Sequence, residues 1–401
     1  MRKAVIIDMV RTPFCKADKE KGWLASYRAD DLGVILIKEM LKRNKLDPKL
    51  IDEVIIGASN QRESQAKPSR NITLMSGIPF DAASLSLDRE CVSSMTAVHT
   101  AAMGIMTGMG DVYIAGGIES MTRFRIPKFS VDQKITTEEI EKLTGRSLNP
   151  NLFKVVEPGA VGMGMTAEKL AQVFKIPREA QDRWGLNSNI KADKAHKEGR
   201  FKDEIVPIPV QEGGQTRWID RDQEIRPDST LEKIATLPTP FKPVGGTVNA
   251  ANASKESDGA TMALLMSEEK AAALGYKPLA TIRQLAVTGV DPTIMGYGAT
   301  VAARKAIQRA GLSVDQIELW EINEAFAVVV LVAIQELGIK DAENRVNVNG
   351  GACCIGHPVG ASGARIVGTL AREMERRKAR YGVASICGGM GQGGAVVLER
   401  P

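Results

Sequence analysis

The chain has 401 residues, of which 43% are hydrophobic and 25% charged, and its formal net charge is +5. This length can bury the cores of two or three domains, and the composition is typical of a soluble globular protein. The weak positive charge, without a basic tract, excludes an extended nucleic-acid-binding surface, and no apolar run has the length of a membrane span.

The ends of the chain and its thiols predict a cytoplasmic protein. The N-terminus, MRKAVIIDMVRTPF, passes directly into a strand-like run without a signal-peptide pattern, and the C-terminal Arg400-Pro401 is not a peroxisomal signal. Too few cysteines are present, at scattered positions, for a disulfide framework, and with only three histidines we expect no metal site. The cysteines are Cys15, Cys91, Cys353, Cys354 and Cys387, and the histidines are His99, His196 and His357.

The first predicted elements have the order strand, helix, strand. Residues 5–7 predict a strand, residues 30–42 have the spacing of an amphipathic helix, and residues 46–57 predict a turn followed by a buried strand. This alternation is typical of an α/β fold.

Residues 89–119 are the stretch around which the rest of the sequence is arranged. No Asp, Glu, Lys or Arg lies between Cys91 and Asp111, and apolar residues recur at helical spacing, so we expect a wholly buried helix. At its start, unpaired N–H groups and the helix dipole would favour the thiolate of Cys91. The strand-like residues 112–115 and two glycines follow. A nucleophile on a rigid platform and a buried core cysteine explain this stretch about equally well.

The middle of the chain, roughly residues 121–250, has a different character. Residues 128–151 are polar and predict loops, and residues 165–174 and 178–199 predict helices. Residues 200–247 carry many charges and prolines with little periodicity. We therefore expect an inserted loop domain that covers the platform.

The end of the chain repeats the pattern of its beginning. A core strand is predicted at 259–266, a helix at 300–310, and residues 312–323 match the pattern of residues 46–57 at an offset of 266. The same offset aligns His357 with Cys91. We therefore predict a duplicated α/β fold with an N-terminal half at 1–268, which includes the insertion, and a C-terminal half at 277–401.

Three further motifs carry reactive side chains. Asn323 begins the NEAFA run after a strand, His357 lies in GGACCIGHP, and Cys387 begins CGGMGQGGA. Each residue also has a structural interpretation, because Asn323 could cap the next helix, His357 could be a core histidine and Cys387 a buried small residue. We interpret Cys15, Cys353, Cys354, His99 and His196 as structural or surface residues.

Together with the Cys91 segment, these motifs resemble the thiolase family nearly from end to end. The family signatures are a Cys-x-Ser before a buried helix, NEAFA, GHPxGxSG and a glycine-rich CxG ending. The resemblance implies a five-layer α/β/α/β/α duplicated fold and an acyltransferase. It also implies an enzyme that cleaves 3-oxoacyl-CoA with CoA, or runs the reverse Claisen condensation, as in β-oxidation.

In the family chemistry Cys91 attacks the 3-keto carbon and carries the acyl group as a thioester. His357 is the base for Cys91, and Cys387 moves the protons of the acetyl-CoA carbanion and of incoming CoA. Asn323, through a water, and the His357 ring form one oxyanion hole. The N–H groups of Cys91 and Gly389 form the other.

The resemblance also implies which groups bind substrates and partners. It implies no cofactor and no metal, with CoA as a substrate, and a homodimer or homotetramer that could be a subunit of a fatty-acid oxidation complex. The residues expected to contact CoA are Met163, Arg226, Phe241, Ala250, Ser254 and Phe326.

Several alternatives remain open from the sequence. An acetoacetyl-CoA thiolase working in the condensing direction is disfavoured by Gly162, since such relatives have histidine there, and by Ser94-Met95, which resembles the degradative branch. Met390, beside Gly389, stands where the family commonly has glycine, and it could narrow the second oxyanion hole. A ketoacyl synthase would need a second histidine, and a non-catalytic acyl- or lipid-binding relative would lack one of the four reactive residues.

Overall fold

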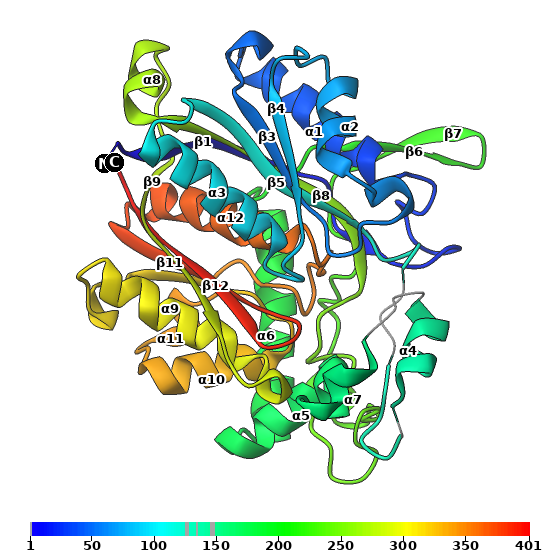
Figure 1. Ribbon diagram of the computed structural model, residues 1–401. Coiled ribbons are helices and arrows are strands. Elements are labelled where there is room, and N and C mark those ends of the chain that lie inside the picture. The colour runs from blue at the N-terminus through cyan, green and yellow to red at the C-terminus, as the bar shows by residue number, and fades with distance from the viewer. Residues whose placement is uncertain (1, 125–127, 134, 145–148) are drawn as a thin grey trace.

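The computed structural model describes residues 2–124, 128–133, 135–144 and 149–401 (Figure 1). In this part of the chain, hydrogen bonds join ten strands into one sheet in the order β10-β11-β12-β9-β1-β8-β5-β3-β4, with β2 paired to β8. The strands are β1 (Ala4–Arg11), β2 (Cys15–Lys16), β3 (Glu53–Gly57), β4 (Ala83–Leu87), β5 (Val112–Ser120), β8 (Ser257–Ser267), β9 (Ala280–Gly289), β10 (Leu319–Ile322), β11 (Tyr381–Gly388) and β12 (Gln392–Glu399).

The two halves of the sheet repeat one topology. β3 and β5 are parallel, as are β10 and β11, and each pair continues through two antiparallel neighbours, β8 and β1 in one half and β12 and β9 in the other. Among the described residues, the two half-sheets are joined by the strand pairing of Val5 with Thr281 and Ile6 with Ala280. The duplication expected from the 266-residue offset is therefore present in the topology, whereas the domain limits 1–268 and 277–401 stay a prediction.

Helices form three layers around these half-sheets, which confirms the predicted five-layer α/β fold. Separate apolar cores lie on the outer side of the first half-sheet, between the half-sheets, and on the outer side of the second. The helices of these layers, in the same order, are α1 (Ala29–Arg43) with α2 (Pro68–Met75), α3 (Ser93–Thr107) with α12 (Ser362–Arg377), and α9 (Tyr297–Arg309) with α10 (Ala327–Leu337).

Helix α3 is less buried than its composition predicts. It begins at Ser93, two residues after Cys91, and ends where Gly108 adopts a left-handed conformation. One face packs in the central layer, but Met103 within the helix is 50% exposed, and Met109, just beyond its end, is 79% exposed. The prediction of a wholly buried helix is therefore wrong, because the uncharged outer face lies at the molecular surface.

The insertion contains more regular structure than the sequence predicts. Its helices α5 (Met163–Phe174) and α6 (Arg178–Lys197) agree with the predicted ranges. The segments predicted as loops contain α4 (Thr137–Thr144), the hairpin of β6 (Ile208–Glu212) and β7 (Gln215–Ile219), and α7 (Leu231–Ala235). The parts of the predicted insertion at 125–127, 134 and 145–148 lie outside the described residues.

The remaining elements are short. Two further α-helices are α8 (Glu268–Ala273) and α11 (Ala342–Arg345), and six 3₁₀ turns lie at Pro48–Leu50, Glu63–Gln65, Pro150–Lys154, Pro158–Val161, Pro292–Ile294 and Val314–Gln316. Within the described ranges, none of the helices combines the length and the apolar character needed to cross a membrane.

A buried arginine fixes the insertion to the first strand. Arg11 at the end of β1 is 0% exposed, and its guanidinium binds Glu204 at 2.7 Å and Asp222 at 2.6 Å. Asp222 also accepts from the backbone N–H of Phe14 at 2.7 Å, and His196 lies 3.2 Å from it. This network attaches the insertion beside the start of the chain, so that it covers the ends of the strands.

Candidate active site

A cavity of about 520 Å³ lies between the insertion and the two halves. Two of the predicted catalytic residues, Cys91 and His357, line it, whereas Cys387, Asn323 and Gly389 do not. Five of the six residues expected to contact CoA also line it, namely Met163, Phe241, Ala250, Ser254 and Phe326.

Cys91 lies at the wall of this cavity and is 9% exposed. The residue before it, Glu90, has φ +46°, an uncommon conformation that turns the chain into α3. Burial raises the pKa of the Cys91 thiol well above its usual range, neighbouring Cys387 and Glu90 add to this, and the N–H of Gly389 opposes it by donating to Cys91. The expected preference for thiolate is therefore wrong, because burial outweighs the effect of the helix start.

His357 is held with one ring nitrogen free. Its Nδ1 lies 2.7 Å from the hydroxyl of Ser362, which donates to the carbonyl of Pro358 at 3.0 Å. Since that hydroxyl proton is used, Ser362 accepts from Nδ1–H, and the lone pair is left on Nε2. Nε2 has no partner among the described residues. Burial, and then the positive charge of Arg365, lower the pKa of His357 to about 3.

Cys387 lies at the end of β11, behind the cavity wall. It is 0% exposed and shares an apolar cluster with Phe326, which lines the cavity. Burial raises the pKa of its thiol to about 12. The tight turn after it places Gly389 against Cys91, and this turn requires left-handed backbone at Met390 (φ +59°) and Gly391 (φ +78°).

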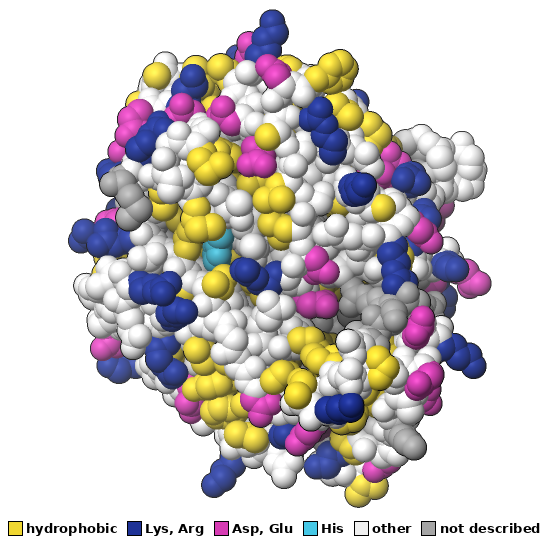
Figure 2. Space-filling view, viewed as in Figure 1, with side chains coloured by type: hydrophobic (Ala, Val, Ile, Leu, Met, Phe, Trp, Pro, Cys, Tyr) yellow, Lys and Arg dark blue, Asp and Glu magenta, His cyan; other side chains and the backbone are white. Residues whose placement is uncertain are grey.

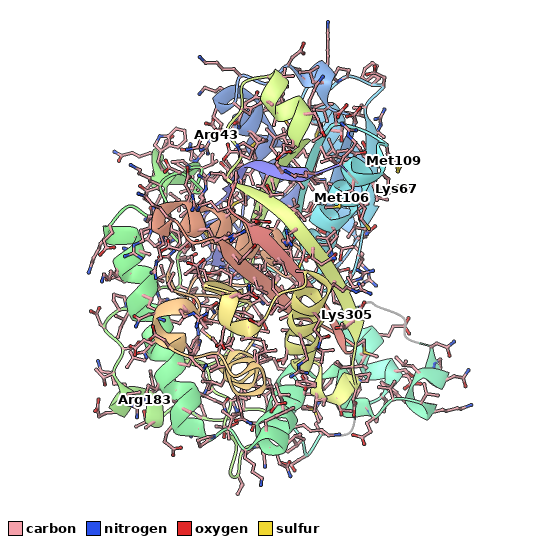
Figure 3. All side chains as sticks on the ribbon, turned by 90° about the vertical axis from the view of Figure 1, so that its left-hand side faces the viewer. Arg43, Lys67, Met106, Met109, Arg183 and Lys305 are labelled. Carbon is pink, nitrogen blue, oxygen red and sulfur yellow. The ribbon has the colours of Figure 1, made fainter. Side chains whose placement is uncertain are left out.

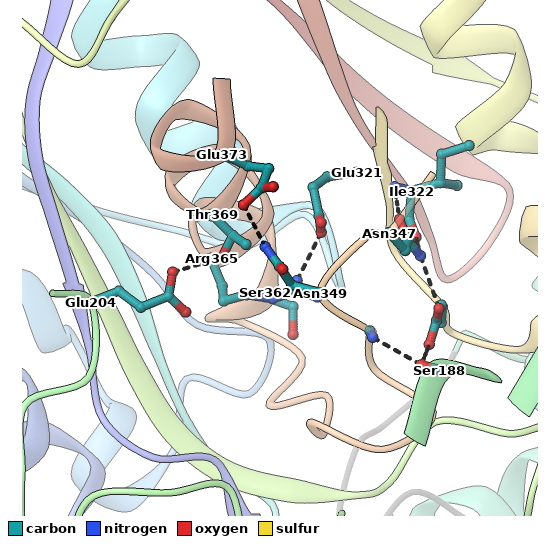
Figure 4. Close-up of polar contacts among 12 residues, drawn as sticks. Ser188, Glu204, Glu321, Ile322, Asn347, Asn349, Ser362, Arg365, Thr369 and Glu373 are labelled. Atoms are coloured by element: carbon teal, nitrogen blue, oxygen red, sulfur yellow. Dashed lines mark hydrogen bonds and ion pairs between the residues drawn. The ribbon is translucent and has the colours of Figure 1, made fainter. Parts of the chain in front are cut away.

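Asn323 follows β10 and is completely buried. Neither its amide nitrogen nor its amide oxygen has a partner in the described part of the chain. It does not cap α10, whose N-cap is Phe326. The next residue, Glu324, fixes this loop by accepting from Trp184 at 2.9 Å, Ser188 at 2.7 Å and Asn347 at 2.9 Å. Asn347 also donates to the carbonyl of Ile322 in β10 at 2.8 Å (Figure 4).

Reciprocal hydrogen bonds lock the Cys91 and His357 segments together. The N–H of Ser94 donates to the carbonyl of Gly360 at 3.1 Å, and the N–H of Ala364 donates to the Ser94 hydroxyl at 2.9 Å. The buried carboxylate of Glu119 on β5 accepts from the N–H of Gly360 at 2.7 Å. A Cβ at Gly117 would lie 2.0 Å from the Gly360 carbonyl oxygen, so this contact requires glycine.

The cavity wall also contains groups that sequence reasoning missed. Arg226 does not line the cavity itself but pairs at 3.1 Å with Glu224, which does, so its role in binding CoA stays a prediction. Lys16, Lys128 and Lys255 line it instead. Isolated lysines belong to no motif, so only the fold could reveal that they converge.

The remaining cysteines and histidines occupy structural positions. Cys15, Cys353 and Cys354 are buried and free, and His99 is buried in α3. His196 belongs to the Asp222 network described above. The described residues contain no cluster of His, Cys, Asp and Glu side chains arranged to hold a metal ion.

Comparisons with known proteins agree with this fold and these motifs. Residues 4–269 match "Thiolase, N-terminal domain" and residues 276–400 match "Thiolase, C-terminal domain". Proteins named 3-ketoacyl-CoA thiolase from Marinobacter nauticus and Psychrobacter cryohalolentis are 43% and 42% identical, over 100% of this chain and 98% of theirs.

Two solved structures are similar over the whole chain. They are human mitochondrial 3-ketoacyl-CoA thiolase (TM-score 0.88, 34% identity) and the Bacillus anthracis acetyl-CoA acetyltransferase (TM-score 0.87, 36% identity). Each comparison covers 100% of this chain and 99% of the other. The chain therefore belongs to the thiolase family.

Proposed function

We propose that this thiolase cleaves 3-oxoacyl-CoA with CoA, giving acetyl-CoA and an acyl-CoA shortened by two carbons. The observation that carries the proposal is Cys91 at the wall of the cavity, with His357 lining the same space and offering a free Nε2. The names of the similar proteins from Marinobacter and Psychrobacter support the same reaction.

In the first half-reaction the sulfur of Cys91 attacks the 3-keto carbon while Nε2 of His357 takes the thiol proton. The bond between carbons 2 and 3 then breaks, its electron pair goes to carbon 2, and Cys387 donates its thiol proton there. The products are acetyl-CoA and a thioester on Cys91. Both thiols and the imidazole begin uncharged, which agrees with the raised pKa of Cys91 and the lowered pKa of His357.

In the second half-reaction the thiolate of Cys387 takes the proton of incoming CoA. The CoA sulfur attacks the thioester carbon, the bond to Cys91 breaks, and Cys91 regains its proton from the imidazolium of His357. Each residue returns to its starting state, so no cofactor or metal is required.

Two groups of hydrogen-bond donors stabilise the negatively charged oxygens that form during the two half-reactions. The buried amide of Asn323, through a water, and the Nε2–H of His357 act on one oxyanion, and the N–H groups of Cys91 and Gly389 act on the other. The unpartnered amide of Asn323 and the approach of Gly389 to Cys91 support these roles.

CoA enters through the wall made by the insertion. Met163, Phe241 and Phe326 offer apolar contact to the pantetheine, and Ala250 and Ser254 lie in the same wall. Lys16, Lys128 and Lys255 bring positive charge for the CoA phosphates to this wall, beside the carboxylates of Asp18, Glu224 and Glu256. Arg226, paired with Glu224 of the same wall, could contact the nucleotide end of CoA.

Acyl chains longer than acetoacetyl are the expected substrates. Gly162 precedes Met163 and Gly164, which line the cavity, and a Cβ at this position would lie 2.9 Å from Sδ of Met165. A larger side chain there must displace Met165, whereas glycine leaves room, and each buried methylene contributes about 0.8 kcal/mol. The acetoacetyl-CoA-specific alternative is therefore disfavoured.

The test is kcat/KM for thiolysis across 3-oxoacyl-CoAs of increasing length, for the wild type and Gly162→His. We expect longer chains to be cleaved at least as efficiently as acetoacetyl-CoA, and Gly162→His to favour the short substrate. A steep fall beyond four carbons in the wild type would contradict the chain-length proposal. Absence of cleavage at every length would contradict the proposed function.

Two copies of the chain are proposed to pair along β4. In the described part of the sheet this edge strand bonds only to β3, and such edges readily accept another strand. Exposed apolar side chains lie on β4 itself, on the neighbouring α2 and the loop that follows it, and on α3 and just beyond its end. They are Leu74, Met75, Phe80, Leu85, Met103 and Met109. Figure 2 shows hydrophobic side chains on this side of the molecule, and Figure 3 shows Met106 and Met109 at the surface.

That the chain associates with subunits of a fatty-acid oxidation complex, and that it is located in the cytoplasm, stay predictions.

A further inference from the structure

The loop at residues 249–255, just before β8, forms one wall of the active-site cavity. It is an irregular segment without a helix or strand of its own, so its shape depends on the contacts that its neighbours make with it. Five of its seven residues line the cavity, namely Asn249, Ala250, Ala253, Ser254 and Lys255. The residues behind this wall therefore decide where it stands.

A buried carboxylate on α6 holds the first half of this loop. Asp182 is 5% exposed, and its Oδ1 accepts from the side-chain amides of Asn249 and Asn252, both at 2.7 Å. Its Oδ2 accepts from Nε of Arg178, one turn earlier on α6, at 3.2 Å. Arg178 is fixed in turn by the carbonyl of Leu237 at 2.8 Å. Asp182 is thus a fixed double acceptor for two amides of one loop.

The same two amides shape the backbone of the loop. The side-chain oxygen of Asn249 accepts from the N–H of Ala251 at 2.8 Å, and that of Asn252 accepts from the N–H of Asn249 at 2.9 Å. Each amide therefore uses its nitrogen toward α6 and its oxygen toward the loop. Through them Asp182 acts on the path of the backbone, and not only on two side chains.

A glycine one turn after Asp182 lets α6 lie directly against the loop. A Cβ at Gly185 would lie 2.2 Å from the carbonyl oxygen of Ala251, so this contact requires glycine. Residues three apart on a helix share one face, and Asp182 and Gly185 therefore meet the loop together. The hydrogen bonds hold the loop against α6, and the close backbone contact limits how far it can approach.

The second half of the loop is held by the reacting segments instead. The N–H of Ser254 donates to the carbonyl of Ala325, two residues after Asn323, at 3.0 Å. The N–H of His357 donates to the carbonyl of Lys255 at 2.9 Å. The loop thus joins α6 at one end to the segments of Asn323 and His357 at the other.

We propose that Asp182 and Gly185 are positioning residues that hold the loop at 249–255 in the form that binds CoA. They do not line the cavity, and they act on it through the loop. The inference rests on the proposed function, in which CoA is a substrate. Because the reacting segments hold the other end of the loop, loss of the α6 contacts should weaken CoA binding more than it slows the reaction of bound substrates.

The experiment alters the two contacts from α6 separately. Asp182→Ala leaves the amides of Asn249 and Asn252 without their acceptor, whereas the conservative variant Asp182→Asn keeps one oxygen for both. Gly185→Ala presses on the carbonyl of Ala251 and leaves the carboxylate in place.

The matched control is Asp8→Ala. Asp8 is also 5% exposed, and it likewise accepts from an asparagine amide, Asn44 at 2.8 Å, and from an arginine, Arg372 at 2.6 Å. It belongs to β1 and is not among the residues that line the cavity. This variant therefore records what the loss of a comparable buried acceptor does elsewhere in the protein.

Three readouts separate positioning from stability. Calorimetric titration with CoA gives its Kd and needs no turnover. Steady-state thiolysis gives the KM for CoA and kcat, and thermal unfolding records any loss of stability in each variant.

We expect the Kd and the KM for CoA to rise about tenfold in Asp182→Ala, because the loop must leave its binding form for the two amides to find other partners. kcat should change less than KM. Gly185→Ala should shift the same quantities in the same direction, while Asp182→Asn and the control should keep the affinity of the wild type.

A wild-type Kd in both Asp182→Ala and Gly185→Ala would overturn the proposal, as would an equal rise in Asp8→Ala. If Asp182→Ala fails to fold, the Kd of Gly185→Ala decides. A wild type that binds CoA but cleaves no 3-oxoacyl-CoA would refute the proposed function, while the Kd values would still decide the role of Asp182 and Gly185.

Discussion

Cys91 and His357 line the same cavity, and burial favours the uncharged form of both. Burial disfavours both the thiolate and the imidazolium, so the proton transfer between them is delayed until a substrate carbonyl can accept the negative charge. A thiol that stays protonated at rest is protected from oxidation and from side reactions. In the proposed mechanism, the low-dielectric site therefore restricts nucleophilic attack to the complex with substrate.

Replacing Cys387 should separate the two halves of the reaction. In Cys387→Ala no thiol protonates carbon 2 or activates CoA, so steady-state thiolysis should fall by at least about 10². Acylation of Cys91 by acyl-CoA should remain detectable by mass spectrometry. Cys15→Ala, at another buried cysteine, is the control and should keep turnover. Near-normal turnover of Cys387→Ala would refute the role of this thiol.

Asn323→Ala should reduce the rate without unfolding the protein. Removing one oxyanion-hole donor costs about 2.7–4 kcal/mol, or roughly 10²–10³ in kcat. Because the amide makes no hydrogen bond within the described structure and caps no helix, the melting temperature should change little. Steady-state kinetics and thermal unfolding measure the two effects. A large loss of stability with normal kcat would mean that Asn323 is structural.

The sequence predicts the candidate reactive side chains, two of which line the cavity, but not the residues that support them. Cys91, Asn323, His357 and Cys387 each lie in a short motif of glycines and small residues. Glu119 and Gly360 are 241 positions apart and meet only because β5 and the start of α12 are adjacent in the fold. The charge state of Cys91 was predicted wrongly because a helix start is visible in the sequence and the extent of burial is not.

The contact between the ends of α3, β5 and α12 defines the geometry of the site at the scale of elements. Gly117 on β5 allows the Gly360 carbonyl to approach, and Gly363 allows α12 to approach α3, since a Cβ there would lie 2.5 Å from the backbone nitrogen of Met95. Glycine at these positions lets two helices enter from opposite halves of the chain and place Cys91 and His357 in one cavity.

Gly117→Ala should damage both stability and activity. The added Cβ would meet backbone at 2.0 Å, and displacing the Gly360 segment should cost about 1–3 kcal/mol or more in unfolding free energy. The same displacement moves His357, so kcat should also fall. The control is Gly289→Ala, where the nearest atom would be 4.0 Å away. Denaturant unfolding and thiolysis rates that match the control would refute this account.

Elements with strong periodicity could be predicted, and elements defined by their neighbours could not. The ranges of α1, α5, α6 and α9 agree with their apolar spacing to within three residues. β4, with the short sequence ASLSL, is a strand only because β3 pairs with it. The hairpin of β6 and β7 lies in a charged, proline-rich stretch whose pattern resembles a loop.

At the scale of the whole molecule, the exposed edge at β4 and the apolar face beside it predict a dimer. Leu85→Lys/Met103→Glu places charges on the edge strand and on α3, so the variant should sediment as a monomer. Val244→Glu, at an 88% exposed position in the insertion, should leave the dimer intact. Sedimentation equilibrium measures both masses. A wild-type monomer, or a double variant that remains dimeric, would contradict pairing along this edge.

The central claim is that Cys91 carries the acyl group during thiolysis. The most direct measurement is rapid quenching of the protein with a 3-oxoacyl-CoA, followed by digestion and mass spectrometry of each cysteine peptide. The account predicts that the shortened acyl mass appears on the peptide containing Cys91, and that added CoA removes it. An acyl mass on the peptide containing Cys387, Cys353 or Cys354, or turnover by Cys91→Ala, would contradict it.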